Sequence, residues 1–185
     1  AAEATLSTML ALLGPDEALA TAICDDARQG DILVPANFNT PGQIVLSGSL
    51  PACERAARIA EAKPGLRAMP LKVAGAFHSP FMQSAADQMA EVLAPVAFNA
   101  PKFPVISNVT AQPHTDAAST KALLVRQVIA PVRWYPSIDT LRAMGVTDWI
   151  EVGPGRSLTG MMKKIDRKAP VEHYATTDGL ASAAV

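Results

Sequence analysis

The stretch Thr8-Met9-Leu10-Ala11-Leu12-Leu13-Gly14 begins the part of the sequence that decides the fold. It is a short apolar run closed by glycine, and this pattern predicts a buried β-strand. Pro15, Asp16 and Glu17 follow directly. Because proline suits the first turn of a helix and acidic side chains suit its positive end, these residues predict the start of an alanine-rich helix. The helix is expected to run to about Gln29.

The alternation of strands and helices continues beyond this first pair. The same patterns predict further elements up to residue 73: strands over 31–36, 43–48 and 66–73, and a helix over 49–63. The first two of these strands should pair as a hairpin, because Asn39-Thr40-Pro41-Gly42 has the residue types of a tight turn. Ser49 is suited to cap the helix. The resulting order, β-α-β-β-α-β, predicts a ferredoxin-like small subdomain over residues 1–73.

Residues 74–185 have a different pattern, in which single strands alternate with helices. Helices are predicted over 79–93, 119–129, 135–144 and 156–165, and strands over 103–108, 148–152 and 171–176. The first helix should place on one face the side chains of Met82, Ala86, Met89, Ala90 and Leu93. This alternation is typical of part of a parallel α/β sheet. So few strands would leave sheet edges unpaired, and we therefore expect the missing strands upstream of Ala1.

The composition excludes several classes of protein. Hydrophobic residues make up 49% of the 185 residues and charged residues 18%, which is typical of a globular chain. The net charge is -1 and no stretch is strongly basic, so nucleic-acid binding is not expected. No apolar run approaches the ~18 residues of a membrane span, so no membrane segment is expected either.

The cysteines and histidines indicate the compartment and exclude a metal centre. Cys24 and Cys53 lie in apolar helical patterns, which indicates buried free thiols in a reducing compartment and therefore a cytoplasmic protein. His78, His114 and His173 are scattered, with no cysteine or carboxylate at ligand spacing. We therefore predict no metal site.

The segment most suggestive of chemistry is Gly75-Ala76-Phe77-His78-Ser79-Pro80-Phe81-Met82. It places a histidine between a predicted strand and a predicted helix. An isolated histidine is more often a core or capping residue than a functional one. Gly75 permits close backbone approach, however, and Ser79-Pro80 fixes a helix start. An acyl-transfer histidine needs such a corner, since one ring nitrogen takes a nucleophile's proton while a fixed acceptor holds the other.

Other candidate positions have ordinary structural explanations as well. Gln127 lies near the end of a predicted helix that stops before Pro131, so a free carbonyl there could accept a hydrogen bond from a neutral imidazole. The Gly153-Pro154-Gly155 segment follows a strand and is best interpreted as a tight structural turn, because it lacks a nucleotide-binding pattern. Asn37 and Asn39 beside the predicted hairpin are typical turn residues.

The motifs taken together resemble those of a known family. They occur in this order: Asn37-Phe38-Asn39-Thr40-Pro41-Gly42-Gln43, Gly75 to Ser79, Ser107-Asn108-Val109, Val125 to Trp134, and Glu151 to Gly155. Any one of them is weak alone, but their conjunction resembles the malonyl-CoA:acyl-carrier-protein transacylases. The resemblance spans nearly the whole chain.

The resemblance implies a fold and a reaction. In that family a ferredoxin-like small domain is inserted in an α/β-hydrolase-like large domain, so residues 74–185 would be the C-terminal part of the large domain. The enzyme forms a malonyl-serine intermediate from malonyl-CoA and passes the malonyl group to the phosphopantetheine thiol of acyl-carrier protein. No cofactor is implied, because the CoA thioester is a substrate.

The resemblance also implies roles for particular residues. His78 would be the general base and acid, and the backbone carbonyl of Gln127 would orient its ring. Phe77 would favour malonyl over methylmalonyl by crowding an α-methyl branch. Arg67, Asn37 and Asn39 would border the entrance for CoA and carrier protein, where Arg67 could meet a phosphate.

One departure from the family is large. The chain has no Gly-x-Ser-x-Gly nucleophile elbow, and it lacks the family's malonyl-binding arginine and N-terminal glutamine loop. The resemblance therefore implies a fragment without its N-terminal half, inactive alone. Two alternatives stay open: an acyltransferase domain of a polyketide synthase, and a non-catalytic fragment that binds carrier protein.

Overall fold

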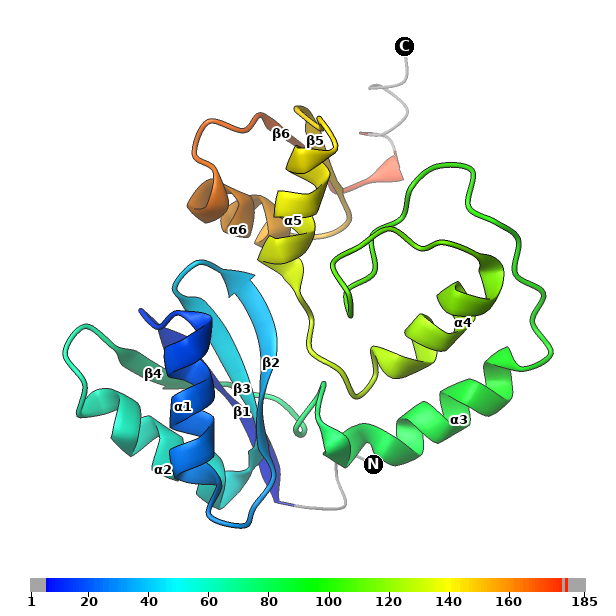
Figure 1. Ribbon diagram of the computed structural model, residues 1–185. Helices are drawn as coiled ribbons and strands as arrows, with labels where there is room; N and C mark the ends of the chain where they lie inside the picture. The colour runs from blue at the N-terminus through cyan, green and yellow to red at the C-terminus, as the bar shows by residue number, and fades with distance from the viewer. Residues whose placement is uncertain (1–5, 178, 180–185) are drawn as a thin grey trace. The chain divides into compact units, whose positions relative to one another are not determined.

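The N-terminal part of the chain folds into a four-stranded antiparallel sheet with two helices on one face (Figure 1). The computed structural model describes residues 6–177 and 179. The elements follow the order β1 (Ser7–Leu13), α1 (Glu17–Arg28), β2 (Leu33–Thr40), β3 (Gln43–Ser49), α2 (Leu50–Glu61) and β4 (Arg67–Pro70). In the sheet the strands lie in the order β2-β3-β1-β4, each antiparallel to its neighbours.

The face of the sheet covered by α1 and α2 carries the main hydrophobic core. The strands contribute large aliphatic side chains, which include Leu10, Leu12, Leu33, Ile44 and Leu46. The helices contribute mostly alanines together with Cys24 and Cys53, and these small side chains let the helices lie close to the sheet. Both cysteines are free and buried, as predicted. Burial raises the pKa of Cys24 to about 12 and that of Cys53 to about 11.

The two helices begin where the sequence predicts. The Asp16 carboxylate accepts a hydrogen bond from the Leu19 amide at 2.7 Å and caps α1. The Ser49 hydroxyl accepts one from the Ala52 amide at 3.2 Å and caps α2. Each cap satisfies an amide that has no partner inside its helix, so it fixes the point at which the strand ends and the helix begins.

The β2–β3 hairpin is tighter than predicted. β2 continues to Thr40, which pairs with Gln43, so only Pro41 and Gly42 form the turn. Gly42 has φ +79°, a backbone conformation that glycine adopts without strain. The prediction that Asn39 and Thr40 belong to the turn is wrong, because cross-strand pairing extends further than the turn-forming residue types indicated.

The second face of the sheet carries a smaller cluster that helps to hold the next segment. Met9, Ala11, Ala36 and Val45 are buried there, and the side chains of Leu71 and Phe77 pack against them. β4 ends at Pro70, three residues before the predicted end at residue 73. The chain beyond β4 therefore folds back across this second face instead of continuing as a strand.

A later segment covers the outer edge of β2. Val132 donates a backbone hydrogen bond to the Ala36 carbonyl and accepts one from the Phe38 amide, both at 2.8 Å. The pairing is parallel and coincides with an irregular register of β2 between Pro35 and Asn37. It brings the end of the next helical region to the sheet.

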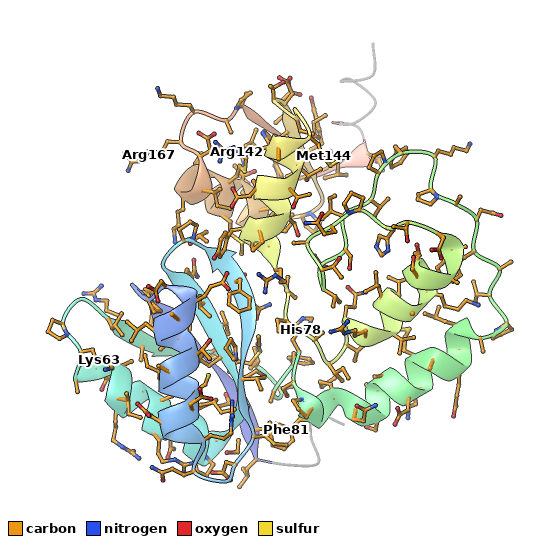
Figure 2. All side chains as sticks on the ribbon, viewed as in Figure 1. Lys63, His78, Phe81, Arg142, Met144 and Arg167 are labelled. Carbon is orange, nitrogen blue, oxygen red and sulfur yellow. The ribbon has the colours of Figure 1, made fainter. Side chains whose placement is uncertain are left out.

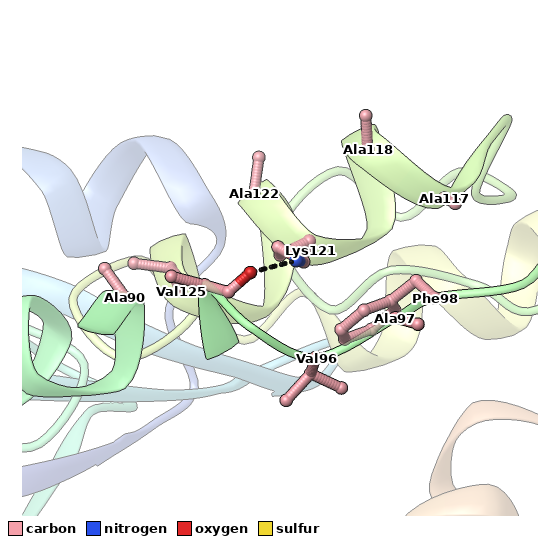
Figure 3. A pocket seen from close by; sticks show the side chains of 10 residues that line it. Ala90, Val96, Ala97, Phe98, Ala117, Ala118, Lys121, Ala122 and Val125 are labelled. Carbon is pink, nitrogen blue, oxygen red and sulfur yellow. Dashed lines mark hydrogen bonds between the residues drawn. The ribbon is translucent and has the colours of Figure 1, made fainter. Parts of the chain in front are cut away.

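A short 3₁₀ helix and two α-helices follow the sheet in this part of the chain. A short 3₁₀ helix, η1 (Pro80–Met82), leads into α3 (Gln83–Leu93), and α4 (Ala117–Arg126) packs against α3. Of the predicted apolar face of α3, Ala86 is buried and Met89 is exposed. A groove of about 610 Å³ lies along both helices, lined largely by alanine and valine side chains, with the Lys121 ammonium above the Phe98 ring (Figure 3).

The strand predicted over 103–108 is wrong. The described segment forms only an isolated bridge between Ile106 and Pro113, and the Phe103 side chain is 73% exposed. An apolar run becomes a strand only when a neighbouring strand accepts its backbone hydrogen bonds, and the described residues offer none here.

The remaining helices and strands belong mostly to a second compact unit. Contacts divide the chain into two compact units, residues 1–137 and 138–185, with α5 (Trp134–Ala143) crossing the boundary. In the second unit, β5 (Trp149–Val152) pairs in parallel with β6 (Val171–Tyr174), and α6 (Ser157–Ile165) connects them. None of the helices in the described part of the chain has the length and hydrophobicity of a membrane span.

Candidate active site

The backbone at His78 is unusual. His78 has φ +56°, in the left-handed region, between the buried residues Ala76 and Ser79. This conformation costs a residue with a Cβ atom about 1–2 kcal/mol, so its surroundings must hold it in place. The left-handed turn ends the segment that crosses the sheet and starts η1, whose cap is the Ser79 hydroxyl.

The left-handed turn presents the His78 ring to the end of α4. The Nδ1 atom lies 2.9 Å from the backbone carbonyl oxygen of Gln127, and Figure 2 shows the His78 side chain beside this end of the helix. Gln127 is the C-terminal cap residue of α4, where a carbonyl oxygen has no partner within the helix. A carbonyl can only accept, so Nδ1 must carry a hydrogen, and in the neutral ring this leaves the lone pair on Nε2.

The side chain of Gln127 makes a separate contact. Its amide oxygen accepts a hydrogen bond from Asn108 Nδ2 at 3.4 Å, while the Asn108 carbonyl accepts one from the Arg133 amide at 2.9 Å. Asn108 thus bridges the two ends of the 127–133 segment. The sequence contained a signal for it, since Asn108 belongs to the Ser-Asn-Val motif, but single-sequence reasoning assigned it no role.

Three buried or half-buried hydroxyls surround the His78 segment. Ser47 Oγ donates to the Phe77 carbonyl at 2.6 Å, and Ser79 Oγ donates to the Ala76 carbonyl at 2.6 Å. Ser7 Oγ accepts from the Ala76 amide at 3.2 Å. Ser7 and Ser47 lie on β1 and β3. Sequence reasoning missed them, because their relation to His78 depends on the pairing of strands far away in the chain.

The other predicted site residues lie on the segment before His78 and on strands β2 and β4. Phe77 precedes it and packs, half-buried, on the second face of the sheet. Asn37 and Asn39 are half-buried on β2, with Asn37 bridged to Val132. Arg67 is exposed on β4 opposite Leu13, at the end of the sheet that carries the β2–β3 turn. The structure brings His78 and Gln127 together; among the described residues, neither forms a hydrogen bond with Asn37, Asn39 or Arg67.

The Gly153-Pro154-Gly155 turn in the second unit is built around a carboxylate. Glu151 is only 8% exposed and accepts hydrogen bonds from the amides of Leu158 at 3.0 Å and Thr159 at 2.8 Å, and from the Thr159 hydroxyl. The Thr159 hydroxyl, followed by these amides, lowers the pKa of Glu151. The amides at the start of α6 already have this partner, so the turn is structural, as the sequence indicated.

This chain belongs to the acyl transferase domain family, whose model matches residues 6–178. It is similar to the malonyl CoA-acyl carrier protein transacylase of Salmonella typhimurium, with 42% identity over 157 residues that cover 85% of this chain and 51% of the relative. A solved acyl carrier protein S-malonyltransferase from Vibrio cholerae matches with a TM-score of 0.90 and 38% identity, over 96% of this chain and 58% of the other.

A further solved structure contains a partner. It is a malonyl-transacylase in complex with its type II PKS acyl-carrier protein. The match covers 96% of this chain and 58% of the solved chain, with a TM-score of 0.89 and 36% identity. The chain spans about half the length of the curated relatives that it matches.

Proposed function

We propose that this chain supplies the general base of a malonyl-CoA:acyl-carrier-protein transacylase. The observation that carries the proposal is the 2.9 Å contact between His78 Nδ1 and the Gln127 carbonyl, made by a histidine held in a left-handed backbone conformation. This arrangement leaves Nε2 free to move a proton. The names of the relatives support malonyl-CoA and acyl-carrier protein as the substrate and partner.

The proposed reaction has two halves, and in each half His78 accepts one proton and then gives it up. Its Nε2 takes the proton of a serine hydroxyl while the serine oxygen attacks the thioester carbonyl of malonyl-CoA; the CoA sulfur then leaves and takes that proton. The carrier-protein thiol next gives its proton to Nε2 and attacks the malonyl-serine ester, and the serine oxygen leaves with the proton. The serine has no candidate elbow among these 185 residues, so the chain would be inactive alone.

The remaining assignments concern selectivity and entry. Phe77 would disfavour an α-methyl branch, and such discrimination by shape is worth about 1–3 kcal/mol. Asn37 and Asn39 would border the entrance for CoA and carrier protein, with Arg67 meeting a phosphate. No cofactor takes part in this chemistry. The buried free thiols Cys24 and Cys53 are compatible with a cytoplasmic location.

The proposal includes an architecture. Residues 1–73 would be a ferredoxin-like small subdomain, which the antiparallel strand order β2-β3-β1-β4 supports. Residues 74–185 would be the C-terminal part of an α/β-hydrolase-like large domain, which the parallel β5–β6 pair supports. The polyketide-synthase domain and the non-catalytic fragment are less well supported alternatives, because the relatives above are named as transacylases.

The test uses a hybrid enzyme in which these 185 residues replace the matching part of the Salmonella typhimurium relative. Transfer of malonyl from malonyl-CoA to holo acyl-carrier protein is measured by mass spectrometry. His78→Ala should lower the rate by about 10²–10⁴-fold, the usual contribution of a general acid–base group. His114→Ala is the matched control and should retain the rate. An unchanged rate in the His78 variant would refute the proposal.

A further inference from the structure

We propose that Ser47 is a positioning residue for His78, whose hydroxyl fixes the left-handed backbone that presents the ring to Gln127. The structural part of this proposal rests on geometry alone, and its catalytic meaning rests on the function proposed above. Ser47 acts on the imidazole indirectly, through the Phe77 carbonyl, to which Ser47 Oγ donates at 2.6 Å.

The bonded carbonyl is the one that controls φ of His78. The angle φ describes rotation about the N–Cα bond of His78 relative to the peptide plane that joins Phe77 to His78. The Phe77 carbonyl oxygen lies in that plane. A hydrogen bond that fixes this oxygen therefore fixes the reference from which the +56° angle is set.

Ser47 is well placed to act as a rigid donor. It lies on β3, which has β1 on one side and β2 on the other, and it pairs with Met9 and Val34. It is completely buried. Because side chains alternate along a strand, Ser47 faces the same side as Val45, the apolar second face on which the His78 segment lies.

A hydroxyl in this place needs an explanation. The other side chains of this cluster are Met9, Ala11, Ala36 and Val45, all apolar. A buried hydroxyl without a partner is unfavourable, and removing it leaves the half-buried Phe77 carbonyl without this donor. The Ser47–Phe77 hydrogen bond gives both groups a partner, and it joins the Ser47 hydroxyl to the segment that carries His78.

The two neighbouring serines, Ser7 and Ser79, do not bond to the peptide group between Phe77 and His78. Ser7 and Ser79 both bond to Ala76, at its amide and its carbonyl respectively. They fix the peptide groups on either side of Ala76, which precede the plane that defines φ of His78. Among the described residues, Ser47 is the hydroxyl bonded to that plane itself.

The test compares Ser47→Ala with Ser137→Ala in the hybrid enzyme. Ser137 is also buried and donates to a backbone carbonyl, that of Arg133, at 2.7 Å, so its variant reports the general effect of losing such a bond. Long-range ¹H–¹⁵N NMR of the imidazole gives the tautomer, and His78→Gln identifies the His78 signals. We expect the Nδ1–H tautomer in the parent and in Ser137→Ala, and a mixture of tautomers in Ser47→Ala.

Kinetics provide the second measurement. Misplacing a catalytic group by about 1 Å can cost about 10²-fold in rate, so Ser47→Ala should lower kcat by about 10- to 100-fold with little change in KM. Ser47→Thr, which keeps the hydroxyl, should restore both the kcat and the tautomer. If Ser47→Ala does not fold, Ser47→Cys replaces it, since a thiol is a weaker donor of similar size and should give an intermediate result.

The outcomes separate this proposal from the function proposed above. A parent-like tautomer and kcat in Ser47→Ala or Ser47→Cys, or equal losses in the Ser137 control, would overturn the positioning role. A failed His78→Ala test with the tautomer still sensitive to Ser47 would instead overturn the catalytic assignment and leave the structural role intact.

Discussion

At the scale of single residues, the acceptor for the His78 ring is a backbone atom. Gln127 contributes its carbonyl oxygen at 2.9 Å, while its side-chain oxygen accepts a hydrogen bond from Asn108 at the longer distance of 3.4 Å. Gln127→Ala should therefore lower the transfer rate of the hybrid enzyme by less than about 10-fold, far less than His78→Ala. Equal losses in the two variants would mean that the Gln127 side chain, and not its carbonyl, is the functional group.

Glu151 should make stability depend on pH. Its folded pKa lies below the usual value because Thr159 and the α6 amides bind the charged form. A carboxyl with a depressed folded pKa stabilises the fold above its unfolded pKa, and this contribution is lost as pH falls through the folded pKa. The melting temperature should thus fall on acidification, and less steeply in Glu151→Gln. The same slope in Glu151→Gln would contradict this, and exposed Glu91→Gln is the control.

At the scale of elements, two glycines give opposite expectations for the same substitution. A Cβ at Gly48 on β3 would lie 2.2 Å from the Ile32 carbonyl oxygen, whereas a Cβ at Gly160 on α6 would meet open space. Gly48→Ala should destabilise the fold by about 1–3 kcal/mol through overpacking. Gly160→Ala should stabilise it by about 0.5–1 kcal/mol, because alanine favours helix. Denaturant titration measures both, and a stable Gly48→Ala would show that β3 can move away from Ile32.

Helices and strands were predictable where a local sequence pattern determines their ends. They were less predictable where pairing with another strand determines them. The starts of α1 and α2 followed from Asp16 and Ser49, which act within three residues of their own position. The extent of β2 and the absent strand over 103–108 depend on which partner strand is present, and one sequence does not contain this information. For the same reason His78 was found from its own motif, whereas Ser47 was missed, because it lies 30 residues along the chain from its partner Phe77.

At the scale of the whole molecule, apolar surface is exposed on the two-stranded β5–β6 sheet. Ile150 is 63% and Val152 61% exposed on β5. A sheet of two strands is marginally stable by itself, and exposed apolar side chains favour association. We expect the 185-residue chain alone to self-associate in analytical ultracentrifugation, whereas the hybrid enzyme stays dispersed. A monomeric chain that melts cooperatively would contradict this.

The buried cysteines have a consequence for a protein proposed to handle thioesters. A thiolate on the surface would exchange with an acyl thioester and carry the acyl group away from its intended acceptor. The chain has two cysteines, and both lie in the core with pKa values of about 12 and about 11, so at neutral pH they remain protonated and out of reach. Within these 185 residues, neither cysteine is therefore available to compete with the substrate thiols for the acyl group.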